Sequence, residues 1–158
     1  MVYDSKFGNT ERLARAIAEV LGTDTPAALV AASAASVSDL AGVDLLVVGG
    51  PTQGHGVSPA LRAFLDRIPP EAVGDMPTLT FDTRLGWPRF LSGSAAAQIA
   101  KRLTRKGARL LVPAESFLVT SGEGPLAEGE LARASAWADH ARALAGLPGR
   151  EPVSAGCS

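Results

Sequence analysis

Two hydrophobic patterns alternate along the chain: short apolar runs, and longer segments in which apolar residues recur every three or four positions. Residues 45–48 form a continuous apolar run followed by Gly-Gly-Pro, which is typical of a strand buried on both faces that ends in a sharp loop. Residues 59–68 show the spacing of a helix with one buried face. The alternation predicts an α/β fold, in which helices cover both faces of a parallel sheet.

Glycine and proline mark the limits of the predicted elements. We predict strands at residues 1–3, 27–32, 45–48, 78–82 and 108–119. We predict helices at about residues 10–21, 36–40, 59–68 (capped by Ser58), 96–106 and 126–144. The last strand contains Pro113, which has no N–H to donate to a sheet, so we expect it at an edge. The Gly, Pro and Ser content near the C-terminus predicts one domain over residues 1–145 and a flexible tail over residues 146–158.

Composition narrows the functional classes. The 158 residues are 46% hydrophobic and 20% charged, which is typical of a folded domain, and the net charge of -1 gives no indication of binding to nucleic acid or an anionic membrane. No apolar run approaches the ~20 residues of a membrane helix, and the N-terminus lacks a secretory layout, so we expect a cytoplasmic protein. The single cysteine, Cys157, excludes an intramolecular disulfide and a thiolate metal cluster, and His140 has no second ligand at metal-binding spacing.

The loop after the first strand has the composition of a phosphate site. It reads Asp-Ser-Lys-Phe-Gly-Asn-Thr-Glu over residues 4–11 and leads into a helix, whose first N–H groups and positive dipole end favour an anion. Ser5 and Thr10 add hydroxyl donors, Gly8 permits close backbone approach, and Asn9 tolerates unusual dihedral angles. The spacing matches neither a Walker A loop nor the dinucleotide fingerprint, which weakens both of those alternatives.

This loop resembles the phosphate loop of the flavodoxin family, which commonly reads [ST]-x-[ST]-G-[NH]-[ST]-E and here reads Ser-Lys-Phe-Gly-Asn-Thr-Glu over residues 5–11. Phe7 replaces a frequent hydroxyl residue. Residues 49–56 look like the family's second flavin loop, and residues 82–87 look like its third, so the resemblance spans residues 2–144. It implies non-covalent FMN, electron transfer and a five-stranded sheet in the order 2-1-3-4-5.

The resemblance also implies which residues bind FMN. They are Ser5, Lys6, Phe7, Gly8, Asn9 and Thr10 in the first loop, Pro51, Thr52, Gln53, Gly54, His55 and Gly56 in the second, and Asp82, Thr83, Arg84, Gly86 and Trp87 in the third. Trp87 is the preferred residue for stacking on the flavin ring, whereas Trp137 is expected to pack in the last helix. His55 has two open interpretations, a flavin contact or a solvent-facing loop residue.

Three functions remain open. The leading one is an FMN-binding electron carrier that works with a redox partner protein or an NAD(P)H-linked reductase. The second is an enzyme of the same fold, an FMN-dependent NAD(P)H:quinone or protoporphyrinogen oxidoreductase. The third is a flavin-free signalling or interaction module such as a phosphoacceptor domain, although only Asp4 follows the first strand where that class has an acidic cluster.

A basic segment departs from the family's usual acidity. Residues 84–109 contain seven basic residues and no acidic one. They are either a solvated helix face or a surface for an acidic electron partner or the phosphates of a nicotinamide cofactor. Fewer carboxylates near the flavin also predict a low-potential couple that is less negative than in acidic flavodoxins.

Overall fold

The computed structural model describes residues 1–22 and 26–149. Its strands are β1 (Val2–Tyr3), β2 (Val30–Ala31), β3 (Leu46–Pro51), β4 (Pro77–Leu85), β5 (Arg109–Leu110) and β6 (Glu115–Val119). Its helices are α1 (Asn9–Leu21), the 3-10 helix η1 (Val37–Leu40), α2 (Pro59–Arg67), α3 (Pro70–Val73), α4 (Arg89–Ser92), α5 (Ala95–Arg105) and α6 (Glu130–Leu144). The predicted tail lies outside the described residues from residue 150 onward, and so does Cys157.

The sheet has the predicted order, β2-β1-β3-β4-β5, and all of its ladder pairings are parallel. The predicted strand 108–119 forms two pieces, β5 and β6, that pair with successive parts of β4. Pro113 lies between the two pieces, where a missing N–H costs no ladder bond. The predicted edge position of this strand is confirmed, and its break lies at Pro113.

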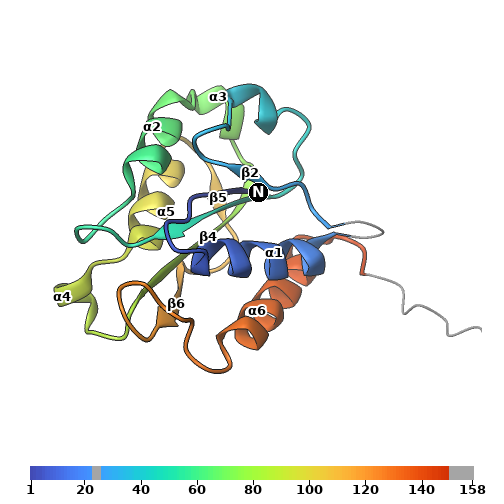
Figure 1. The fold of residues 1–158 in the computed structure, drawn as a ribbon. Coiled ribbons are helices and arrows are strands. Elements are labelled where there is room, and N and C mark those ends of the chain that lie inside the picture. The colour runs from blue at the N-terminus through green and yellow to red at the C-terminus, as the bar shows by residue number, and fades with distance from the viewer. Residues whose placement is uncertain (23–25, 150–158) are drawn as a thin grey trace, which may run out of the picture.

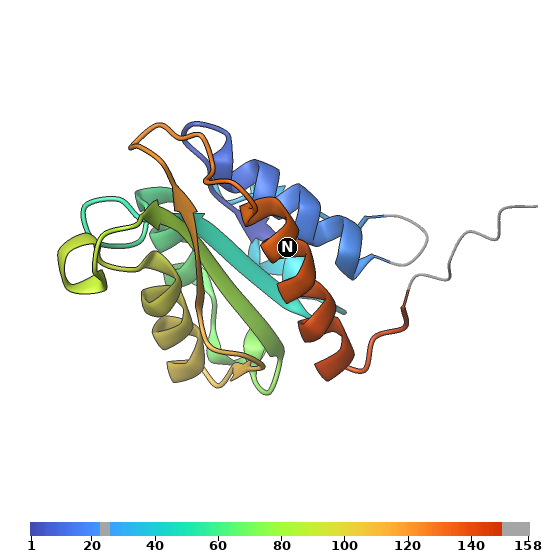
Figure 2. The ribbon, with the colours of Figure 1, turned by 90° about the horizontal axis from the view of Figure 1, so that it is seen from below.

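Helices cover both faces of the sheet (Figures 1 and 2). Helices α1 and α6 pack on one face, and α2 and α5 pack on the other. Apolar residues at helical spacing on α1, α2 and α5 are buried, among them Leu13, Leu61 and Ile99, because this spacing places them on one side of each helix. On the α6 side, Phe81, Phe117 and Trp137 pack edge to face, with ring centroids 5.8–6.3 Å apart.

Several predicted limits of strands and helices are wrong. β3 continues to Pro51 because it pairs with β4 as far as Thr83, and β4 continues to Leu85 because it pairs with β6 as far as Val119. The last helix begins at Glu130 rather than 126, because Leu126 pairs antiparallel with Val119. The predicted strand 27–32 shortens to two residues, and α4 had no counterpart in the prediction. Ser58 precedes α2 but makes no side-chain cap.

Side chains of α6 close the outer edge of β6. Glu130 Oε2 accepts a hydrogen bond from the Leu118 N–H at 2.7 Å, and Arg133 donates to the Ser116 carbonyl. Arg133 also forms ion pairs with Glu130 at 2.8 Å and Glu115 at 3.2 Å. An exposed strand edge is a template for pairing with another chain. These bonds occupy the edge groups that a further strand would otherwise pair with.

The carboxylate of Glu130 should make stability depend on pH. The hydrogen bond from Arg133 is the largest cause that lowers its pKa in the folded protein. A lowered folded pKa gives stability that is complete above the unfolded glutamate value of about 4.3 and is lost as the pH falls through the folded value. We expect Glu130→Gln to lower the free energy of unfolding by about 1–3 kcal/mol at pH 7, because both carboxylate oxygens accept hydrogen bonds.

Urea denaturation of wild type and Glu130→Gln at pH 7, 5 and 3.5 measures this difference. It should shrink between pH 5 and pH 3.5. Glu128→Gln is the matched control, because Glu128 is exposed and has no hydrogen-bond partner in the described part of the chain. A difference that stays constant over this pH range would contradict the assigned role of the Glu130 charge.

Candidate functional site

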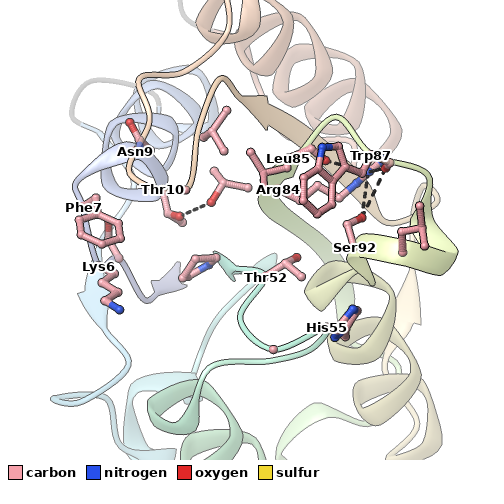
Figure 3. A pocket seen from close by; sticks show the side chains of 17 residues that line it. Lys6, Phe7, Asn9, Thr10, Thr52, His55, Arg84, Leu85, Trp87 and Ser92 are labelled. Carbon is pink, nitrogen blue, oxygen red and sulfur yellow. Dashed lines mark hydrogen bonds between the residues drawn. The ribbon is translucent and has the colours of Figure 1, made fainter.

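A cavity of about 240 Å³ opens at the carboxyl edge of the sheet, between the segments that follow β1, β3, β4 and β6 (Figure 3). The predicted site residues that line it are Ser5, Lys6, Phe7, Asn9, Thr10, Pro51, Thr52, Gly54, His55, Thr83, Arg84 and Trp87. The predicted residues outside its lining are Gly8, Gln53, Gly56, Asp82 and Gly86. The fold thus brings all three predicted loops to one cavity.

The loop before α1 holds free backbone donors. Gly8, with φ at 88°, forms the N-cap of α1. The Ser5 hydroxyl oxygen accepts hydrogen bonds from the N–H groups of Gly8 at 3.1 Å and Glu11 at 3.3 Å. No acceptor in the described chain pairs with the N–H groups of Lys6, Phe7, Asn9 and Thr10. Free N–H groups at the positive end of a 13-residue helix form an anion site.

Two side chains of this loop tie it to distant segments. The Asn9 amide donates to the Glu123 carbonyl at 3.1 Å, and the buried Thr10 hydroxyl bonds to the Thr83 hydroxyl at 2.9 Å. Asn9 was predicted as a ligand contact, but one of its amide N–H groups is engaged within the protein. The loop is therefore held in shape by β4 and by the segment after β6.

The segment after β3 makes a tight turn. The backbones of Gln53 and Gly56 exchange two hydrogen bonds of 2.9 Å, and Gly54 and His55 between them have φ of 52° and 67°. Positive φ at both central residues matches a type I′ turn. The Gln98 side chain of α5 donates to the His55 carbonyl at 3.0 Å, and this anchors the turn on α5.

Trp87 lies at the rim of the cavity and is 59% exposed. Arg84 Nη1 anchors the Trp87 loop by donating to the Trp87 carbonyl at 2.7 Å (Figure 3). It donates more weakly to the Leu85 carbonyl at 3.2 Å and the Ser92 hydroxyl at 3.3 Å. Leu91, on the adjoining α4, lines the same rim and is 51% exposed. The rim therefore presents an apolar surface to whatever occupies the cavity.

Asp82 was predicted to contact the ligand, but its side chain does not line the cavity. Its side chain is fully buried beneath α5, not in the cavity wall. Asp82 Oδ2 accepts hydrogen bonds from the Ser94 hydroxyl at 2.8 Å, the Ala96 N–H at 2.9 Å and the Thr52 hydroxyl at 3.2 Å. The carboxylate sits at the N-terminus of α5, where the helix dipole favours it. It holds the framework of the site rather than a ligand.

The sequence pattern of the flavodoxin family matches residues 1–137. The sheet has the strand order of that fold. The chain belongs to the flavodoxin family. Among curated protein sequences, none matches it significantly. In the part of this flavodoxin-family chain that is described, no helix is long and apolar enough to cross a membrane, and no cluster of three His, Cys, Asp or Glu residues could hold a metal ion.

Solved structures with the same fold include flavodoxins and an oxidoreductase. Oxidised flavodoxin 1 from Bacillus cereus is 18% identical, with a TM-score of 0.73, over 89% of this chain and 94% of that one. The WrbA-like flavodoxin from Agrobacterium tumefaciens is 21% identical, with a TM-score of 0.70, over 92% and 94%. Rubredoxin oxygen:oxidoreductase from Desulfovibrio gigas is 23% identical, with a TM-score of 0.69, over 92% of this chain but 35% of that one. These identities establish the shared fold alone.

Basic residues of segment 84–109 in this flavodoxin-family chain lie in different surroundings. Arg102 pairs with Asp66 at 2.8 Å, and Lys106 donates to the Ile68 carbonyl at 2.7 Å. Arg109 pairs with the first residue of β4, at the opposite end of that strand from the cavity, whereas Arg84 lines the cavity. Arg84 and Arg109 thus lie at opposite ends of β4, and the role of this segment as a surface for an acidic partner stays a prediction.

Five cavity residues were not predicted: Leu85, Leu91, Ser92, Val119 and Gly122. The strand order could have indicated Val119 and Gly122, because the segment after the last strand of a parallel sheet reaches the same edge as the other loops. Leu91 and Ser92 gave no such signal, since they belong to the unpredicted helix α4.

Proposed function

We propose that this cavity binds FMN non-covalently and that the protein transfers electrons between redox partners. One observation carries the proposal: the free N–H groups before α1 lie at one side of the cavity, and the apolar rim at Trp87 lies at the other (Figure 3). FMN joins a dianionic phosphate to a flat aromatic ring. The family to which the chain belongs supports this choice of ligand.

The residues present fit both parts of FMN. The N–H groups of Lys6, Phe7, Asn9 and Thr10 and the hydroxyl of Ser5 would bind the phosphate, and the Lys6 ammonium adds a positive charge. Trp87, Leu91 and the turn at Gly54 would enclose the ring. When bound, FMN supplies the redox chemistry, and the protein holds it and sets its electrostatic surroundings.

Titration with FMN and riboflavin tests the proposal directly. We expect FMN fluorescence to be quenched at one-to-one stoichiometry, and riboflavin to bind at least about 100-fold more weakly. The reason is that the phosphate makes several charge-assisted hydrogen bonds, each worth about 1.5–3 kcal/mol, and each 1.4 kcal/mol is tenfold in affinity. Riboflavin binding as tightly as FMN would contradict the phosphate site, and binding of neither would leave the flavin-free alternative.

An FMN-dependent oxidoreductase is the second candidate. The exposed rim favours it, because Trp87 and Leu91 together with Phe90, which is 84% exposed, offer an apolar platform for a flat organic substrate such as a quinone. Sustained oxidation of NAD(P)H with a quinone by the purified FMN-loaded protein would establish this activity. Reduction only through a separate reductase protein would establish the carrier.

A further inference from the structure

The charges that line the cavity are all of one sign. Its lining contains the cationic side chains of Lys6 and Arg84, and it contains no Asp or Glu. Lys6 belongs to the phosphate loop, and its ammonium lies 5.2 Å from the centre of the Phe7 ring. Arg84 lies across the cavity from it, at the end of β4 (Figure 3). An anion bound at the α1 end would therefore not neutralise the positive charge of Arg84.

Arg84 has no counter-ion in the described part of the chain. Its guanidinium forms no ion pair, and its partners are two carbonyl oxygens and a hydroxyl, which are neutral. Asp82 lies on the same face of β4, two residues earlier, but its bonded oxygen is directed to α5 and Thr52. A half-buried cation without a carboxylate partner is costly unless a ligand offsets it.

We propose that Arg84 stabilises the negative charge that the flavin ring gains on reduction. This inference rests on the proposed binding of FMN. Two electrons and one proton added to the neutral oxidised ring leave one net negative charge on it. With the phosphate at the α1 end, the rest of FMN would occupy the cavity whose lining includes Arg84. A cation there lowers the free energy of the reduced form more than that of the oxidised form.

Arg84 also braces the Trp87 loop, so the experiment must separate charge from bracing. Arg84→Gln keeps an N–H donor for the Trp87 carbonyl but removes the charge. Arg84→Lys keeps the charge but lacks the planar fork of donors. Arg89→Gln is the matched control, because Arg89 is exposed on α4 and does not line the cavity.

The measurement is the two-electron midpoint potential of each FMN-loaded variant, with dithionite as reductant and a reference dye, together with the dissociation constant of oxidised FMN. We expect Arg84→Gln to weaken binding of reduced FMN about tenfold relative to oxidised FMN. For a two-electron couple this ratio lowers the midpoint potential by about 30 mV. Arg84→Lys should stay near wild type, and Arg89→Gln should be unchanged.

Two results would overturn the proposal: an unchanged potential in Arg84→Gln, or an equal fall in Arg84→Gln and Arg84→Lys, which would assign Arg84 to bracing alone. If Arg84→Gln retains no FMN, the comparison of Arg84→Lys with wild type decides, since charge predicts the same potential and bracing predicts a lower one. Failure of wild type to bind FMN is a separate outcome, which refutes the proposed function itself.

Discussion

Replacing Gly93 with alanine is expected to lower the free energy of unfolding by about 3 kcal/mol and to weaken FMN binding at least about tenfold. Gly93 has φ at 72° and ψ at -176°, a conformation that is essentially confined to glycine. A Cβ atom there would lie 2.2 Å from the His55 carbonyl oxygen. Because that contact is with backbone, the whole turn at Gly54 and His55 would have to move.

The Gly93 prediction links the stability of the fold to the shape of the cavity. The turn lines the cavity and is anchored by the Gln98 side chain, so its displacement disturbs the ligand site as well as the packing. Gly86→Ala is the control, because a Cβ at Gly86 meets only Leu118 at an ordinary 3.7 Å. Urea denaturation and FMN titration of both variants measure the two effects, and equal behaviour of the two variants would refute the prediction.

Replacing Asp82 with alanine should cost about 3–5 kcal/mol of unfolding free energy, because three donors lose a shared buried acceptor. Asp82→Asn should cost less, since its amide oxygen can still accept from Ser94 and the Ala96 N–H. The control is Asp66→Ala, which removes an ion pair whose carboxylate is 60% exposed and should cost at most about 1 kcal/mol.

The Asp82 series also separates a framework residue from a ligand contact. Residual FMN affinity of folded Asp82→Asn should stay close to wild type, because the Asp82 side chain does not line the cavity. Denaturation midpoints and FMN titrations on the same samples give both values. A stable Asp82→Asn protein that has lost FMN binding would restore the direct contact predicted from the sequence.

Local sequence was sufficient for the core and for the phosphate loop. The inward faces of α1, α2 and α5 follow from apolar residues at helical spacing, which depends only on neighbours within the same helix. The loop at residues 5–11 combines glycine, hydroxyl residues and a following helix, and the structure places its free N–H groups at the cavity. Both features are encoded within about a dozen consecutive residues.

The third loop shows where this reasoning fails. Residues 83–85 lie beyond the predicted strand 78–82 but belong to β4, because β6 pairs with β4 from Phe81 to Leu85. Side chains alternate along a strand, so the extension sends Asp82 under α5 and Thr83 toward Thr10 on the opposite face. The partner strand begins more than thirty positions later in the sequence, and no local pattern reports the pairing.

The spacing of nearby residues was enough to predict the alternation of the main helices and strands and the buried faces of α1, α2 and α5, and it indicated a loop suited to an anion. Which polar groups of the site lack a partner within the protein depends on the tertiary structure. Asn9 bonds to Glu123, Thr10 bonds to Thr83, and Arg84 has carbonyl and hydroxyl partners but no carboxylate. Such pairings depend on which distant segments the fold brings within hydrogen-bond distance, so charge and donor availability at the cavity emerge only after packing.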